Sequence, residues 1–195
     1  IQTEKISMTE YNKLYEVPIQ LEGYDPTYKG HQGQIKKAAT LIKNAKRPLI
    51  IAGAGVLKSG AMDELKALAE TAHIPVTNTL VGLGGFPGDH ELALGMVGMH
   101  GSVAANNSTD EADLVIAAGI RFHDRITGHP DFFCKKAKII HIDIDPAEID
   151  KNVTIDVPIV GDLKRVLTEL NALVEPAKHE AWLEQIRQWQ EEYPI

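Results

Sequence analysis

Short, continuous apolar runs alternate along the chain with segments in which apolar residues recur every three or four positions. The first pattern is typical of buried strands and the second of amphipathic helices. Strands are predicted at residues 49–52, 75–79, 114–118, 139–142 and 158–160, with a less marked strand near 92–94. Helices are predicted from about residue 34 to a few residues before Pro48, and at 61–72, 103–110, 163–174 and 179–192.

This order of elements predicts βαβ units, and therefore an α/β domain with a mostly parallel sheet covered by helices on both faces. Runs that are apolar at every position, rather than at alternate positions, fit strands buried on both sides. Residues 1–30 are polar, contain prolines and glycines and show no sustained period. They are therefore interpreted as a linker or as an arm lying on another surface.

Composition narrows the class of protein. A chain of 195 residues, 44% of them apolar, can form one α/β domain with a substantial core. The net charge of −7 disfavours nucleic acid and anionic membranes as partners. Cys134 is the single cysteine, which excludes an internal disulfide and suits the cytoplasm. No apolar run approaches the ~20 residues of a membrane span. Because the chain begins with Ile1, we expect a piece of a larger protein.

Small or charged residues follow five of the predicted strands. These groups lie at residues 53–55, 78–80, 119–125, 143–145 and 161–162. In parallel α/β sheets, ligands bind at the carboxyl ends of the strands. The sequence therefore predicts one long, polar, phosphate-containing ligand at that edge.

The glycine-rich segment GAGVLKSG follows the first predicted strand. It does not match the Rossmann fingerprint, because Gly60 comes two places late, and no Gly-Lys-Ser/Thr follows as in a P-loop. Small residues here could let a ligand approach the backbone and could offer amide donors to a phosphate. A tight strand-to-helix turn without any ligand would explain the same residues.

Two arginines, Arg121 and Arg125, follow the strand at 114–118. They could clamp a pyrophosphate or a negatively polarised ring, with Asp124 holding one guanidinium in place. A solvated charged loop is the alternative. The position at the carboxyl end of a strand favours the functional interpretation.

Three aspartates follow the last two strands. Asp143, Asp145 and Asp162 could each accept hydrogen bonds from ribose or adenine groups. Asp145 and Asp162 also stand where N-caps of the next helices are expected, and both interpretations remain open.

Other kinds of chemistry are weakly supported. The histidines lack metal-ligand spacing, and Cys134 has no partner for a zinc site. No G-x-S-x-G elbow or Cys–His pair indicates a nucleophile, and no pair of acids stands out as an acid–base couple. We therefore predict neither catalytic nor metal-binding residues in this chain. The stripe of Trp182 and Trp189 is interpreted as packing.

Five segments, in this order and spacing, resemble the central domain of acetolactate synthases, which are thiamine diphosphate enzymes of branched-chain amino-acid biosynthesis. The segments are RPLIIAGAGVLKSGA, IPVTNTLVGLGGFPGDHELALGMVGMHG, RFHDRITG, AKIIHIDIDPAEIDKNV and VPIVGD. The resemblance covers roughly residues 15–175. It implies a Rossmann-like, three-layer α/β domain with a mostly parallel six-stranded sheet at 31–175. An arm from a preceding domain would occupy 1–30, and a helix or linker to a following domain 176–195.

The resemblance also implies a function. The whole enzyme would condense two pyruvates to 2-acetolactate with release of CO2, using thiamine diphosphate and Mg²⁺ bound by other domains. This middle domain would bind FAD, extended over the strand ends, with no net redox role, and would be inactive alone. Homo-oligomerisation is expected, and a small regulatory subunit is left open.

Matching positions assign residues to parts of the flavin. Gly53, Ala54 and Gly55 would lie along the diphosphate and ribityl chain. Near the isoalloxazine ring would lie Thr79, Leu80, Gly98, Met99, His100 and Gly101. The chain or ring would contact Gly119, Arg121 and Arg125, and the adenosine end would contact Asp143 and Asp162.

Two positions depart from the family pattern. His123 stands where the family has the first aspartate of Arg-Phe-Asp-Asp-Arg, and Cys134 stands where alanine is common. A histidine can donate a hydrogen bond and can carry positive charge, so the family's carboxylate contact cannot be assumed. Three alternatives are left open: pyruvate oxidase, glyoxylate carboligase and a non-catalytic nucleotide-binding module.

Overall fold

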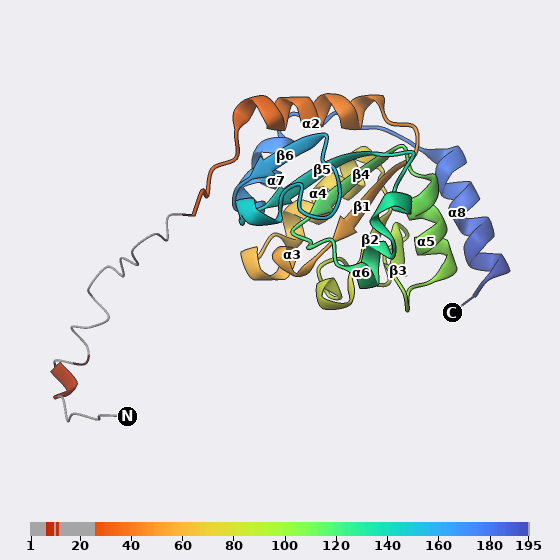
Figure 1. The fold of residues 1–195 in the computed structure, drawn as a ribbon. Helices are drawn as coiled ribbons and strands as arrows, with labels where there is room; N and C mark the ends of the chain where they lie inside the picture. Colours follow the sequence, from red (N-terminus) through yellow and green to blue (C-terminus); the bar gives the residue numbers. More distant parts are fainter. Residues whose placement is uncertain (1–6, 10, 12–25, 195) are drawn as a thin grey trace.

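A computed structural model describes residues 7–9, 11 and 26–194 of the chain. Six parallel strands form one sheet in the order β3-β2-β1-β4-β5-β6 (Figure 1). The strands are β1 Pro48–Ala52, β2 Val76–Asn78, β3 Ala93–Met96, β4 Leu114–Ala118, β5 Lys138–Asp143 and β6 Val157–Val160. The predicted α/β class with a six-stranded parallel sheet is confirmed.

Helices fill most of the connections between these strands. The α-helices are α2 Gln32–Asn44, α3 Ala54–Ser59, α4 Met62–Ala72, α5 Val103–Glu111, α6 Asp124–Thr127, α7 Leu163–Asn171 and α8 Glu180–Glu192. Three short 3-10 turns are η1 Leu80–Gly82, η2 Pro130–Phe132 and η3 Pro146–Glu148. Helices lie on both sides of the sheet: α7 contacts α4 and α2 in one group, and α5 contacts α8 in another (Figure 1). No described helix combines the length and the apolar character needed to cross a bilayer.

The centre of the sheet is its most buried part. Every residue of β1 and of β4 is buried, and the two strands pair along their full length, with Ile50 opposite Ile116. Burial on both faces explains why these two runs carry apolar residues at every position. This rigid centre fixes the positions of the loops that follow β1 and β4.

The strand order reverses between β1 and β4. From β1 the chain moves outward to β2 and β3, then returns through α5 to β4 and continues to β5 and β6 on the other side. At such a switch point the loops after the two central strands leave in opposite directions, which opens a crevice at their carboxyl ends. The fold therefore places a crevice beside residues 53–55 and 119–121.

Helix α8 is packed onto the domain at the C-terminal end of the chain. Trp182 is buried, and its Nε1 donates a hydrogen bond of 3.0 Å to the carbonyl of Pro48 at the start of β1. Trp182 and Trp189 make an edge-to-face contact with 5.9 Å between ring centroids. This confirms that the tryptophan stripe serves packing. The role of residues 176–195 as a connection to a following domain stays a prediction.

Helices α3 and α7 differ from the sequence-based expectations. Residues 54–59 form the short helix α3, where a turn without a helix was predicted, and α7 ends at Asn171 rather than near 174. The arm predicted at 1–30 falls mostly outside the described residues. Its last residues are attached to the domain, because the carbonyl of Tyr28 accepts a 2.9 Å hydrogen bond from the amide of Asp162.

Candidate functional site

A cleft of about 680 Å³ lies at the carboxyl edge of the sheet. Residues that follow β1, β2, β4, β5 and β6 line it, so five strand ends contribute, as the sequence predicts. Its size is within the range of ligand and cofactor pockets, which runs from about 300 to 1,000 Å³.

About half of the residues predicted to contact a ligand line this cleft. They are Ala54, Gly55, Thr79, Gly119, Arg121, Asp143 and Asp162. The other predicted residues lie outside its lining: Gly53, Leu80, Gly98, Met99, His100, Gly101 and Arg125. His123 and Asp145, which the sequence analysis also considered, line the cleft as well. Sequence reasoning did not select the other eight lining residues, which are Leu57, Lys58, Ser59, Val81, Ile120, Ile126, Ile144 and Leu163. The ligand contacts of the predicted residues stay a prediction.

The glycines after β1 and β4 pack against each other. A Cβ atom on Gly53 would lie 2.2 Å from the carbonyl oxygen of Gly119, and one on Gly55 would lie 2.6 Å from the Cα atom of Gly119. Gly119 itself has φ +60°, a conformation that L side chains rarely adopt. Glycine is therefore required here by the contact between two loops at the switch point.

The amide groups of this junction are already used. Gly53 donates to Ala118 (2.9 Å), Gly55 donates to Gly119 (3.0 Å), and Gly119 donates to Ile142 (2.8 Å). Gly53 and Gly55 therefore use their amides within the protein, and their contacts with a ligand stay a prediction. Gly53 is the N-cap residue of α3, and Gly55 lies in the first turn of that helix.

The loop after β3 is anchored beside the cleft. Asn106 of α5 holds Gly98 twice: its Oδ1 accepts from the Gly98 amide (2.9 Å) and its Nδ2 donates to the Gly98 carbonyl (3.0 Å). The amide of Met99 donates to the carbonyl of Arg125 at 2.9 Å, so two predicted regions distant in sequence meet here. The side chain of Met99 is 70% exposed.

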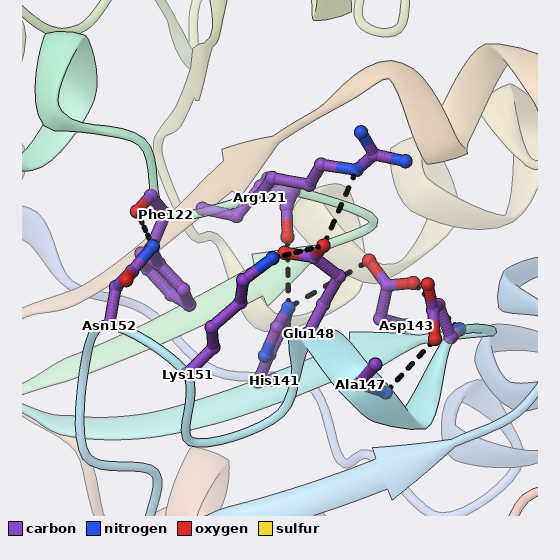
Figure 2. A network of polar contacts seen from close by, with 10 residues as sticks. Arg121, Phe122, His141, Asp143, Ala147, Glu148, Lys151 and Asn152 are labelled. Atoms are coloured by element: carbon purple, nitrogen blue, oxygen red, sulfur yellow. Dashed lines mark hydrogen bonds and ion pairs between the residues drawn. The ribbon is translucent and has the colours of Figure 1, made fainter.

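Arg121 has a different acidic neighbour from the one expected. Asp124 uses its Oδ1 to accept a 2.9 Å hydrogen bond from the amide of Arg125, rather than holding a guanidinium. The carboxylate near Arg121 belongs to Glu148, whose Oε1 lies 3.9 Å from Nε of Arg121 (Figure 2). Glu148 also accepts from Nζ of Lys151 at 2.9 Å. No sequence signal linked Glu148 to Arg121, because the contact joins two different strand connections.

A buried histidine and a half-buried aspartate stand at the end of β5. His141 is fully buried, and burial lowers the pKa of its imidazole, so the ring is neutral and its Nε2–H donates to the carbonyl of Ile120 at 2.9 Å. Burial likewise raises the pKa of the Asp143 carboxyl above its ordinary value. Oδ1 of Asp143 accepts from the amide of Asp145 at 2.9 Å, while Oδ2 lies 3.9 Å from Nε2 of His141. A carboxyl group with a raised pKa facing a cleft is a common feature of binding sites.

Asp145 and Asp162, which the sequence left open between N-cap and ligand contact, are both N-caps. Oδ1 of Asp145 accepts from the amide of Ala147 (2.9 Å), and Oδ1 of Asp162 accepts from the amide of Arg165 (3.1 Å). Both residues also line the cleft. Because a carboxylate has a second oxygen, capping and ligand contact do not exclude each other.

Among the described residues, no cluster of three or more histidine, cysteine or acidic side chains could hold a metal ion. The thiol of Cys134 is buried, and burial raises its pKa, which makes the reactive thiolate scarce.

The fold agrees with what comparison with known proteins shows. Residues 35–170 match the family described as thiamine pyrophosphate enzyme, central domain, and the chain belongs to that family. The particular relatives it resembles are acetolactate synthases, which confirms the resemblance predicted from the motifs.

Three relatives illustrate this. The chain is 56% identical over 177 residues, 88% of its length, to a probable acetolactate synthase large subunit of Methanocaldococcus jannaschii. It is 51% identical over 156 residues, 80% of its length, to an acetolactate synthase of Mycobacterium bovis. It is 44% identical over 180 residues, 92% of its length, to an acetolactate synthase large subunit of Buchnera aphidicola. The matches span 30%, 25% and 31% of these relatives, so the chain covers about a third of their length or less.

Proposed function

We propose that the cleft binds FAD and that the protein carrying this chain is an acetolactate synthase, which condenses two pyruvates to 2-acetolactate with release of CO2. The observation that carries the proposal is the cleft at the switch point of the sheet, in a chain whose relatives are named acetolactate synthases. A flavin dinucleotide has a flat apolar ring, an anionic diphosphate and a polar adenosine, and each part has a counterpart along the edge of the sheet.

The ring would lie on the side of β2 and β3. Val81 and Ile126 line the cleft there, with the exposed side chains of Leu80 and Met99 next to them in sequence or in space. Thr79 is 2% exposed, and no hydrogen bond to its Oγ1 is found within the described part of the chain. A buried hydroxyl without a partner costs free energy, so a ligand atom that hydrogen-bonds to it would stabilise the complex.

The diphosphate would lie near the centre of the cleft. Lys58 and Arg121 are the fixed positive charges that line it, one after β1 and one after β4. A guanidinium can bind two phosphate oxygens at once, whereas a lysine acts as a point charge. These side chains would bind phosphate oxygens beside Gly53 and Gly55, whose amides donate within the protein.

The adenosine would lie on the side of β5 and β6. Asp143 and Asp162 line this part of the cleft, and the cap of Asp162 uses Oδ1 and leaves Oδ2 able to accept. Ribose hydroxyls and the adenine amino group are donors, so these carboxylates are suitable partners for them.

In the whole enzyme, thiamine diphosphate with Mg²⁺ would supply the carbon–carbon bond chemistry from other domains. The residues of this chain would hold the flavin and exclude water from it, which requires no catalytic side chain here. A cytoplasmic location and assembly into a homo-oligomer, with or without a small regulatory subunit, belong to the same proposal.

The test is a reconstitution of the full-length protein. With FAD, thiamine diphosphate, Mg²⁺ and pyruvate we expect 2-acetolactate and CO2, and with FAD omitted after its removal we expect the product to be lost. Formation of hydrogen peroxide would indicate a pyruvate oxidase, and the absence of acetolactate in the complete mixture would refute the proposal.

The 195-residue chain alone should bind FAD more weakly than the full-length protein, so nanomolar affinity of that piece measured by calorimetry would contradict the proposed contribution of flanking domains.

A further inference from the structure

The backbone that carries Arg121 is held in place by buried residues on both sides. Its neighbours Ile120 and Phe122 are buried, with 2% and 4% exposed, whereas the side chain of Arg121 is 62% exposed. The two apolar side chains fix the backbone on either side of Arg121 in the core. Of these three residues, only Arg121 therefore has a side chain outside the core.

Two neutral side chains also fix the backbone carbonyls that flank Arg121. Nε2 of His141 donates to the carbonyl of Ile120 at 2.9 Å, and Nδ2 of Asn152 donates to the carbonyl of Phe122 at 2.8 Å (Figure 2). His141 also packs edge-on against the ring of Phe122, with 5.0 Å between ring centroids. One of these anchors belongs to β5 and the other to the connection between β5 and β6.

Glu148, from the same connection, forms an ion pair with the arginine side chain. Its own side chain is only 11% exposed, and its Oε1 lies 3.9 Å from Nε of Arg121. Figure 2 shows that Glu148 approaches Nε, while the two terminal nitrogens of the guanidinium point away from the carboxylate. Those terminal nitrogens are the pair that binds phosphate in a bidentate way. Arg121 lines the cleft and Glu148 does not, so the carboxylate supports the arginine from behind.

Lys151 balances the negative charge of Glu148, so that this carboxylate does not neutralise Arg121. Its Nζ lies 2.9 Å from Oε1 of Glu148, so the carboxylate has two cationic neighbours. The three side chains together carry a net charge of about +1 at neutral pH. One positive charge therefore remains for an anion in the cleft.

We propose that Glu148 and Asn152 are positioning residues for Arg121, and that the connection between β5 and β6 thereby sets how strongly the cleft binds the phosphate groups of its ligand. The inference rests on the proposed function, because it takes the ligand to be a flavin nucleotide. Neither residue has to touch the ligand. Each limits the conformations of Arg121 before the ligand binds, so that Arg121 loses less conformational entropy on binding.

The first test uses Asn152→Ala in the full-length protein, because this substitution changes no charge. Titrations would follow the binding of FAD and of riboflavin, which has the same ring without phosphate. We expect the FAD dissociation constant to rise about fivefold, as for loss of the pre-ordering of one long side chain, and the riboflavin constant to stay unchanged. In an Arg121→Ala background, Asn152→Ala should have no further effect on FAD, since the residue it positions is gone.

The second test removes the ion pair without changing net charge. Glu148→Gln with Lys151→Met should weaken FAD binding by a similar factor and again spare riboflavin. The matched control is Glu111→Gln with Lys136→Met, because Glu111 likewise lies between an arginine, Arg47 at 3.4 Å, and a lysine, at a position that does not line the cleft. The control should leave both constants unchanged.

Circular dichroism and thermal unfolding would establish that each variant is folded. An equal loss of FAD and riboflavin binding, or no loss of either in a folded variant, would overturn the positioning role while leaving the proposed function intact. Absence of FAD binding by the unmodified protein would overturn both, so the two failures are distinguishable.

Discussion

The two halves of the carboxyl edge differ in chemistry. On the side of β2 and β3 the edge carries large apolar side chains in solvent, with Leu80, Val81 and Met99 each about 70% exposed. On the side of β4, β5 and β6 it carries Arg121 and Asp143. A contiguous patch of solvent-facing apolar side chains often marks a binding surface. The difference fits the proposed ligand, which is apolar at one end and charged at the other, and it is the basis of the direction that we propose for it.

The boundary between the two halves is the glycine junction of Gly53, Gly55 and Gly119. Their backbones touch because the chain leaves β1 toward one half and β4 toward the other. The cleft can run continuously from the apolar to the charged half only if no side chain stands at this crossing.

The largest effect is expected at the junction itself. Gly119→Ala combines a φ of +60° with a Cβ atom 2.6 Å from the Cα atom of Gly55, and should destabilise the fold by about 3 kcal/mol. Gly60→Ala is the matched control, because Gly60 has φ +64° and nothing within 4 Å of its Cβ position, and should cost about 1 kcal/mol. Urea unfolding measures both. Equal costs would show that the two loops can move apart and that the junction is not rigid.

The next effect concerns the charged half. Arg121→Ala should raise the FAD dissociation constant of the full-length protein by about 10- to 100-fold, as for loss of hydrogen bonds to a charged group. Arg187→Ala is the control, since Arg187 is an exposed arginine of α8 that pairs with Glu184. Fluorescence titration with FAD gives the constants. Unchanged retention of FAD would remove Arg121 from the site and would leave the charged half without its assigned role.

A smaller effect is expected in the apolar half. Leu80→Ser should weaken binding of FAD and of riboflavin alike, by about fivefold, because part of a leucine side chain would no longer be buried by the ring. Binding of ADP, which lacks the ring, should not change. Leu173→Ser, at an exposed leucine beyond the end of α7, serves as control. A loss of ADP binding in Leu80→Ser would reverse the direction that we assign to the ligand.

The sequence predicts the fold well where burial decides the pattern. Strands such as β1 and β4 are apolar at every position because both faces are covered, and that signal is local in sequence. Helix α3 was missed because it has only six residues and begins inside a glycine-rich segment, where a turn is the usual expectation. Local pattern therefore determines long elements better than short ones.

The candidate site was predicted less completely, because its contacts join distant segments. The five strand ends could be named from the rule that ligands bind at carboxyl ends. The need for glycine at these positions could not be predicted from the sequence. Position 53 must be glycine because the backbone of Gly119 lies against it, and a local sequence pattern does not show which residues meet in space. Glu148 was missed for the same reason, and Asp124 was chosen in its place because it is adjacent to Arg125 in sequence.

The smallest effect is a pH dependence confined to the charged half. Burial raises the pKa of Asp143 in the folded protein above its ordinary value of 3.8, so the ionised carboxylate is less stable there than in the unfolded chain. The stabilisation from the protonated form is complete below pH 3.8 and is lost as pH rises through the raised pKa. Asp143→Asn, whose amide oxygen can still accept from the amide of Asp145, should therefore stabilise the fold at pH 7 by less than about 1 kcal/mol, with the gain shrinking toward pH 4. Thr79→Val in the apolar half replaces a buried hydroxyl without a partner among the described residues, and its gain should be the same at every pH. Urea unfolding midpoints between pH 4 and pH 7 distinguish the two, and a gain for Asp143→Asn that does not vary with pH would show that ionisation of this carboxyl does not oppose folding.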